Sequence, residues 1–172
     1  MIGRRGTIAV LGGLGALLLA FGVVSGCQGA NRLRGHEGVM ADAEKVAARF
    51  VQAYGTFDFR EPAAYRDGLL GLTTGSAYEE FASSQVDPTA VGQQRTLTTD
   101  VVAVEVTAFS AGVATALVTA DQTRRAVDPT TGQLSERRAR QHITCRLSLV
   151  AGHWAVADFQ LTSQELLQNN SK

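Results

Sequence analysis

The sequence predicts an α+β fold in which three helices pack on one face of a curved four-stranded antiparallel sheet. Two observations predict it. Apolar side chains recur at helical spacing over residues 40–83, and from residue 97 to residue 161 they alternate with polar ones, as in half-buried strands. Turn signals separate the strands, which favours hairpins, and helices that precede such a sheet can cover its apolar face. With 172 residues, the chain is long enough for one such core.

A membrane-targeting segment is predicted over residues 1–26. Residues 7–24 contain no charged side chain and follow Arg4 and Arg5. This stretch approaches the ~20 apolar residues that span a bilayer and exceeds the ~7–15 of a signal peptide. The Val-Ser-Gly-Cys sequence that ends at Cys27 nevertheless resembles a bacterial lipobox, in which the cysteine receives a lipid. A retained transmembrane helix and an acylated Cys27 are both possible, and both place the remaining chain outside the cytoplasm.

Residues 27–38 contain three glycines among polar residues, which predicts a flexible spacer. Residues 39–162 are predicted to form the folded domain. The last ten residues, 163–172, are expected to be a short C-terminal helix or a tail.

The three helices are predicted from their apolar spacing. The first covers residues 40–54, after which a glycine provides a stop signal. The second begins near Pro62, because proline is tolerated in the first turn of a helix. The third covers residues 76–83, with Tyr78 expected to face inwards.

Four strands follow the turn signal Asp87-Pro88. The first, residues 97–108, changes phase, so we expect a bulge near Asp100, with Val102 and Val104 on one face beyond it. The other three strands are predicted over residues 113–125, 138–149 and 153–161. Tight hairpin turns are predicted over residues 110–112 and 151–152.

Charge and cysteine content exclude several classes of protein. The chain has 16 basic and 16 acidic residues, and two of the basic ones lie in the membrane segment, which leaves 14 outside it. A nucleic-acid binder usually has a basic excess, so no nucleic acid is expected as a partner. Cys27 and Cys145 do not make a disulfide framework. Three scattered histidines and no cysteine pair at ligand spacing predict neither a metal site nor a cofactor.

The end of the predicted sheet resembles a known family. Residues 152–156 read Gly-His-Trp-Ala-Val, and the last hairpin of the nuclear-transport-factor-2-like fold, also called the ketosteroid-isomerase-like cone fold, often reads Gly-x-Trp-x-Val. Residues 53–60 and 72–75 are similar to membrane-anchored members of Gram-positive bacteria. Two groups fit: the conjugation-channel scaffold subunits of type IV secretion systems and the Mce-associated membrane proteins of lipid uptake. The resemblance covers residues 39–161.

The resemblance implies a cone domain on the extracytoplasmic side of the bacterial cell membrane. Its partners would be the membrane, through the N-terminal segment, and subunits of an envelope transport complex. We expect a non-catalytic scaffold, with conjugative DNA transfer as the first function and Mce-type lipid uptake as the second. A small-ligand-binding lipoprotein of cone fold is a further alternative.

Enzymes of this fold place a carboxylate general base inside the cone, and one acid of this chain is a candidate. Asp158 is in phase with Trp154 on the last strand, so it is expected at a pocket mouth, with Tyr54 nearby. One carboxylate without a paired acid or histidine is weak support for acid–base chemistry. A cone-fold isomerase or hydrolase is therefore only the alternative to a protein without catalytic residues.

Arginines gather on both sides of the predicted loop at residues 128–132. We expect them to form a basic ladder on the polar sheet face, where they would either be simply solvated or dock an acidic partner or a second copy of the chain. The members of this predicted interaction face are Arg124, Arg138, Arg140 and Arg146.

Overall fold

The computed structural model describes residues 37–85 and 87–167. The chain divides into two units, residues 1–39 and 40–172, and the fold described below is that of the second unit. The predicted membrane segment, Cys27 and nearly all of the predicted spacer lie outside the described residues. Among the residues that are described, no helix is both long and apolar enough to cross a membrane.

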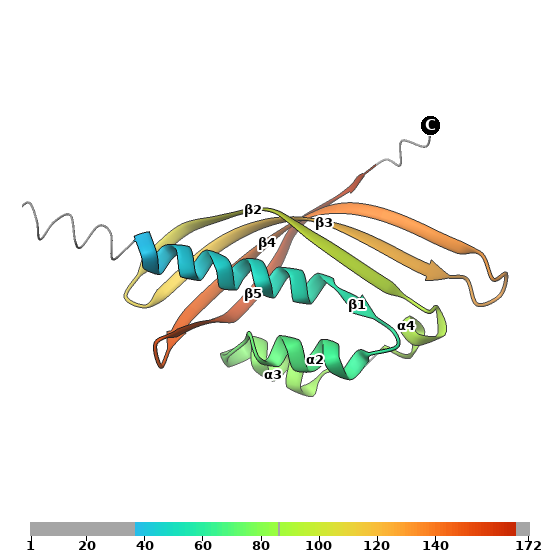
Figure 1. Ribbon diagram of the computed structural model, residues 1–172, viewed down its shortest axis with the longest axis horizontal. Coiled ribbons are helices and arrows are strands. Elements are labelled where there is room, and N and C mark those ends of the chain that lie inside the picture. The colour runs from blue at the N-terminus through green and yellow to red at the C-terminus, as the bar shows by residue number, and fades with distance from the viewer. Residues whose placement is uncertain (1–36, 86, 168–172) are drawn as a thin grey trace, which may run out of the picture. The chain divides into compact units, whose positions relative to one another are not determined.

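A curved antiparallel sheet forms the body of the domain (Figure 1). Its strand order is the chain order, so strands that follow one another in the chain are neighbours in the sheet. The connection from the first strand to the second, residues 59–95, contains three helices, and the other connections are hairpins. The sheet has five strands where four were expected, because two residues after the first helix pair with the start of the long strands. The strands are β1 (Phe57–Asp58), β2 (Thr96–Ser110), β3 (Val113–Val127), β4 (Leu134–Val150) and β5 (His153–Leu167).

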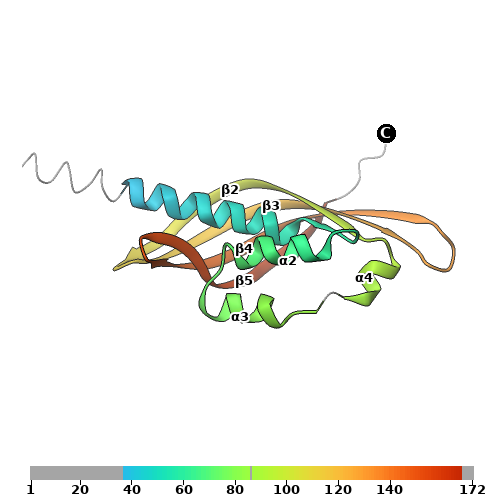
Figure 2. The same ribbon diagram turned by 60° about the horizontal axis from the view of Figure 1, so that its bottom comes forward.

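Four helices are described, one more than expected, and they lie on one side of the sheet (Figures 1 and 2). The extra one is a five-residue helix within the predicted turn. Asp87 caps it by accepting a hydrogen bond from Thr89 N at 2.9 Å, and Pro88 fits its first turn. A helix of five residues is too short to show a repeated apolar spacing, so the sequence did not predict it. The helices cover residues 37–55, then α2 (Pro62–Leu70), α3 (Gly75–Ser83) and α4 (Pro88–Gly92).

The core lies between the first helix and the concave face of the sheet. Phe50 and Val51 of this helix are fully buried, and β3 presents a row of small side chains to them. Phe50 also joins an aromatic cluster with Tyr54, Phe81 and Phe159, and its ring centroid lies 5.1 Å from that of Phe159. This cluster connects the first helix to α3 and to β5. The small residues of β3 are Ala114, Ala116, Val118 and Ala120.

Two bulges in β2 place its apolar side chains. Val102 and Thr107 are the extra residues, since Val101 and Ala103 pair with consecutive residues of β3, as do Val106 and Ala108. The single bulge expected near Asp100 is therefore two residues further on, and a second one was missed. Val102 was expected to share a face with Val104, but as the bulge residue it is 55% exposed.

The last strand is longer than predicted. Residues 163–167, expected to be a short helix or a tail, continue β5 to Leu167 and pair with Arg138 to His142. The physical reason is the length of β4, which starts at Leu134, so that its residues 138–142 offer backbone groups to the chain returning beside them. Both tight hairpins were predicted correctly. Ala111-Gly112 and Ala151-Gly152 have positive φ at both positions, as the two central residues of a type I′ turn require.

Candidate functional site

Asp158, the acid predicted at a pocket mouth, lies on the other face of the sheet. Leu147 pairs with Val156 and Arg146 with Asp158, so Ala157 is an extra residue in β5. A bulge of one residue reverses the alternation of side chains, and Asp158 is exposed beside Arg146 instead of following Trp154 inwards. Its Oδ1 accepts a hydrogen bond from Phe159 N at 2.9 Å. The structure therefore contradicts the predicted position of this acid.

Trp154 and Tyr54 are not brought together either. The buried Trp154 packs edge-on against Phe109 of β2, with ring centroids 6.0 Å apart. Tyr54 belongs to the aromatic cluster of the core, and its ring centroid lies 4.9 Å from that of Phe159. Both are packing residues, so no catalytic centre forms around the three residues named from the sequence.

The predicted basic ladder is divided between the two faces of the sheet. Arg138, Arg140 and Arg146 alternate with buried residues of β4 and lie on the outer face, away from the helices. Arg124 is directly opposite Arg137 on the inner face, where its Nη2 reaches Gln93. The structure therefore removes Arg124 from the predicted interaction face.

The outer face is not basic. Arg140 forms a two-pronged ion pair with Asp121, with distances of 2.7 Å (Nε to Oδ1) and 2.8 Å (Nη2 to Oδ2). This hydrogen bonding lowers the pKa of Asp121. Arg125 pairs with Glu136 at 2.8 Å. By the strand register, the acids on this face outnumber its four arginines; they are Asp100, Glu105, Asp121, Glu136, Asp158 and Glu165.

Described residues on the inner side of the sheet line two hollows that were not predicted from the sequence. The first, here called the apolar cleft, has a volume of about 590 Å³ and lies among α2, α3, α4 and the start of β2. Its lining is mostly apolar and aromatic, with the guanidinium of Arg95 among the polar groups. The lining residues used below are Phe57, Tyr65, Phe81, Arg95 and Leu97.

The second hollow, here called the arginine hollow, has a volume of about 380 Å³. It lies between the segment that joins α4 to β2 and the hairpin that joins β3 to β4. Gln93, Arg124, Asp128 and Arg137 are among its lining residues. A backbone hydrogen bond from Val127 N to the carbonyl oxygen of Gln93, 2.7 Å long, connects the two segments that form its walls.

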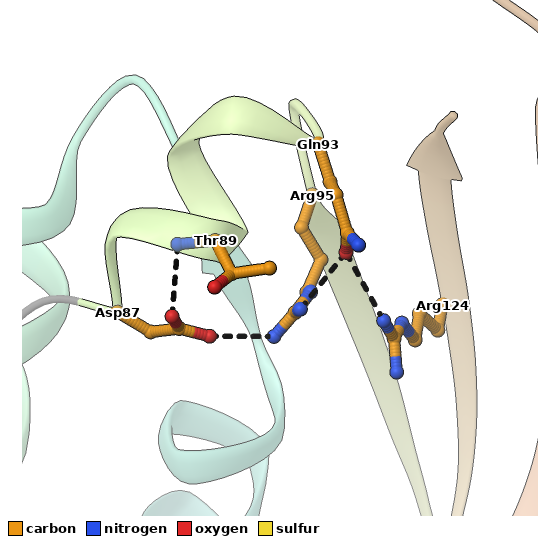
Figure 3. Close-up of polar contacts among 5 residues, drawn as sticks. All are labelled: Asp87, Thr89, Gln93, Arg95 and Arg124. Carbon is orange, nitrogen blue, oxygen red and sulfur yellow. Dashed lines mark hydrogen bonds and ion pairs between the residues drawn. The ribbon is translucent and has the colours of Figure 1, made fainter. Parts of the chain in front are cut away.

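A polar network joins residues that line the two hollows (Figure 3). Gln93 Oε1 accepts from Arg95 Nη2 at 2.9 Å and from Arg124 Nη2 at 3.3 Å. Arg95 Nη1 lies 3.4 Å from Asp87 Oδ2, while the other oxygen of Asp87 caps α4 through Thr89 N. The buried Nε of Arg95 has no hydrogen-bond partner among the described residues.

The charges around this network are unevenly compensated. Burial, followed by repulsion from Arg95 and Arg137, lowers the pKa of Arg124. The carboxylate of Asp128 accepts hydrogen bonds from Thr131 N and Thr130 N of its own loop, and these bonds lower its pKa. Asp87 also has a lowered pKa, first because of the Thr89 backbone hydrogen bond. Both nearby acids are thus already bonded to backbone N–H groups.

The remaining reactive side chains do not assemble a second centre. Cys145 is fully buried in β4, and this burial raises the pKa of its thiol to about 12. His142 Nδ1 lies 3.1 Å from Thr119 Oγ1 on the outer face. Across residues 37–85 and 87–167, no group of three or more His, Cys, Asp or Glu side chains is arranged to hold a metal ion.

The sequence contained one signal for the arginine hollow. The dipeptides Arg124-Arg125 and Arg137-Arg138 lie in strands, where successive side chains point to opposite faces. Each dipeptide therefore supplies one arginine to each face. The β3–β4 register, which sets Arg124 opposite Arg137, depends on the pairing of two strands and is not contained in the alternation of either one.

Comparison with known proteins identifies the fold. No protein-family model and no curated protein matches the chain. The structure of the VirB8 protein of Agrobacterium tumefaciens matches it with a TM-score of 0.54 and 14% sequence identity, over 75% of this chain and 94% of that one. The likeness to VirB8 shows that the two chains share a fold.

Two further solved structures overlap less well. An NTF2-like protein involved in plasmid conjugation has a TM-score of 0.48 and 15% identity, over 72% of this chain and 49% of that one. The soluble domain of TrwG of the type IV secretion machinery from Bartonella grahamii has a TM-score of 0.40 and 16% identity, over 70% of this chain and 91% of that one.

Proposed function

We propose that this chain is a non-catalytic scaffold domain of a bacterial envelope transport machine, located on the extracytoplasmic side of the cell membrane. Conjugative DNA transfer of the type IV secretion kind is the first candidate. The observation that carries the proposal is the fold shared with VirB8 over 94% of that chain. It agrees with the sequence resemblance to conjugation-channel scaffold subunits. Fold alone does not define function, so the proposal needs its own test.

The positions of the candidate catalytic residues also support a scaffold. Asp158 is on the outer face, Trp154 packs on Phe109, and Tyr54 packs in the core cluster. Acid–base catalysis needs a positioned group within reach of a bound substrate and a partner that sets its pKa. These three side chains do not provide that arrangement.

Deletion and complementation test the proposal in the strain that carries the gene. Loss of the chain should reduce DNA transfer to recipients by orders of magnitude, and the full chain supplied in trans should restore it. Site-specific photo-crosslinking from exposed positions should capture other subunits of the transfer apparatus. Unchanged transfer together with reduced lipid uptake would instead favour the Mce-type function, and no change in either would refute an envelope transport role.

The mode of membrane attachment stays a prediction with its own measurement. Intact mass of the membrane-extracted protein separates the two alternatives. A mass that starts at Cys27 and includes acyl chains means a lipoprotein, and a full-length mass means a retained helix.

A further inference from the structure

Two arginines on the inner face have no acidic partner among the described residues, whereas Arg125, the outer-face neighbour of one of them, has one. Arg125 is paired with Glu136 at 2.8 Å, while Arg124 and Arg137 make no ion pair within 4.0 Å among the described residues. Arg124 and Arg137 are directly opposite each other in the register of β3 and β4. Like charges placed in this way destabilise a sheet unless something compensates them.

The surroundings of this pair do not supply the compensation. Arg124 donates only to the neutral Gln93 Oε1, an acceptor that it shares with Arg95. Asp87 and Asp128 are the acids that face this region, and both are held by backbone N–H groups. Arg95 and Arg124 therefore share one amide oxygen, and Arg137 lies opposite Arg124. Of these three guanidinium groups, only that of Arg95 pairs with an acid of the described chain, Asp87. A carboxylate ligand would be bound there by paired, charge-assisted hydrogen bonds.

The apolar cleft adjoins this group of arginines. Arg95 lines the cleft and Gln93 lines the arginine hollow, so the hydrogen bond between them joins the lining of one to that of the other. The cleft is lined by the rings of Phe57, Tyr65 and Phe81, with Phe57 edge-on to Tyr65 at 5.3 Å. Its volume of about 590 Å³ is in the range of sites that bury drug-sized groups.

We propose that the apolar cleft and the arginine hollow form one docking site for an acidic segment of a partner protein. An apolar side chain of that segment enters the cleft, and its carboxylates bind Arg124 and Arg137. Complementary charge selects this occupant, because a free phosphate offers nothing to the aromatic cleft. The inference rests on the proposed scaffold function, since a domain of that kind has to hold a partner.

The binding test uses the full chain in a non-ionic detergent and a fluorescein-labelled peptide of alternating glutamate and phenylalanine. Fluorescence anisotropy should show saturable binding that weakens as salt is raised. Arg124→Gln and Arg137→Gln should each weaken binding by about 5- to 20-fold, the usual scale for one charge-assisted contact.

Each variant has a matched control one residue away on the opposite face. Arg125→Gln and Arg138→Gln change the net charge by the same amount, and they should leave the affinity within about twofold, as expected for residues away from the contact. Equal losses in the inner and outer variants would overturn the proposal, because they would indicate attraction by net charge alone. Thermal unfolding of every variant checks that it is folded. If Arg124→Gln is unstable, Arg137→Gln still tests the proposal, because the Arg137 side chain is exposed.

Changes to the probe test both halves of the site. A peptide with glutamine in place of glutamate, and another with serine in place of phenylalanine, should both bind more weakly. If the glutamine peptide binds as tightly as the original peptide, the role of the arginine hollow is refuted. If the serine peptide does, the role of the apolar cleft is refuted. Inorganic phosphate that competes as strongly as the peptide, or no binding at millimolar peptide, would overturn the proposal. Self-association of the wild-type chain that is lost in the Arg137→Gln variant would also overturn the proposal, because the occupant of the site would then be a second copy of the chain.

This result can be separated from the proposed function. Binding is measured on purified protein, whereas DNA transfer is measured in cells. Peptide binding that fails while deletion still abolishes transfer would refute only the docking site. Binding that succeeds without a transfer phenotype would refute only the conjugative role.

Discussion

Gly55 connects the first helix to the sheet through a contact that tolerates no side chain. Thr99, buried in β2, donates from Oγ1 to the carbonyl oxygen of Gly55 at 2.7 Å, and Gln122 Nε2 donates to the same oxygen at 3.2 Å. A Cβ at position 55 would collide with the Thr99 hydroxyl and lie 2.8 Å from its Cβ. The helix end and the strand can approach this closely only because residue 55 is a glycine.

Gly55→Ala should therefore lower the free energy of unfolding by about 1–3 kcal/mol, the usual cost of overpacking a core. Gly68→Ala is the matched control, since Gly68 lies in α2 with open space around it. This change should raise stability by about 0.5–1 kcal/mol through helix propensity. Urea unfolding followed by circular dichroism measures both, and a Gly55→Ala variant as stable as the wild type would contradict the contact.

Cys145 shows how burial affects a reactive group. The folded chain raises the pKa of its thiol from 9.0 to about 12 because the thiolate would be desolvated. The unfolded chain loses this proton at a lower pH than the folded chain does. The contribution of Cys145 to stability is therefore complete below pH 9 and is lost as the pH rises towards 12.

In a Cys27→Ser variant, Cys145 should not react with iodoacetamide at pH 8 until urea unfolds the protein. Mass spectrometry of the alkylated protein measures this. Replacing Cys145 with alanine should also flatten the decline of stability between pH 9 and pH 11. Rapid labelling of the native variant would show that the thiol is accessible, which contradicts its complete burial.

At the scale of elements, the bulges decide which side chains enter the core. Alternation along β4 was predicted correctly, because residues 139–147 pair with β3 without a register shift. The same reasoning was wrong for Val102 in β2 and for Asp158 in β5, each of which lies at a register shift. A bulge is decided by the pairing of two strands, and the sequence of one strand contains only part of that information.

Deleting Val102 tests the role of its bulge. Because Val102 is the extra residue, its deletion leaves Val101 and Ala103 paired with consecutive residues of β3 and keeps the buried Thr99 on its face. We expect the deletion variant to fold, with a loss of no more than about 2 kcal/mol from the lost bend of the strand. Val102→Thr, which keeps the β-branched shape at an exposed position, should stay within about 0.5 kcal/mol of the wild type. A deletion variant that fails to fold would contradict the two-bulge register.

At the scale of the whole molecule, the core is contained in one unit. All of the buried apolar residues of the described chain lie between Ala43 and Ala157, within residues 40–172. The fold class could be predicted because it follows from the order of helices and hairpins. The site could not, because Arg95, Arg124 and Arg137 are distant in sequence and meet only through the α4–β2 segment and the β3–β4 register.

A fragment of residues 37–172 should therefore fold without the preceding segment. In the same detergent, its thermal midpoint should lie within about 4 °C of that of the full chain, which corresponds to about 1 kcal/mol or less. Differential scanning calorimetry measures both proteins. A fragment without a cooperative transition would show that the first 36 residues contribute to the core.

The connections of the sheet make its two ends chemically different. The type I′ turns at Ala111-Gly112 and Ala151-Gly152 join β2 to β3 and β4 to β5, so both lie at one end. The β3–β4 hairpin, beside the arginine hollow, lies at the other. A fluorophore or an affinity tag inserted at either tight turn would therefore report the orientation of the domain within an assembly without covering the docking site.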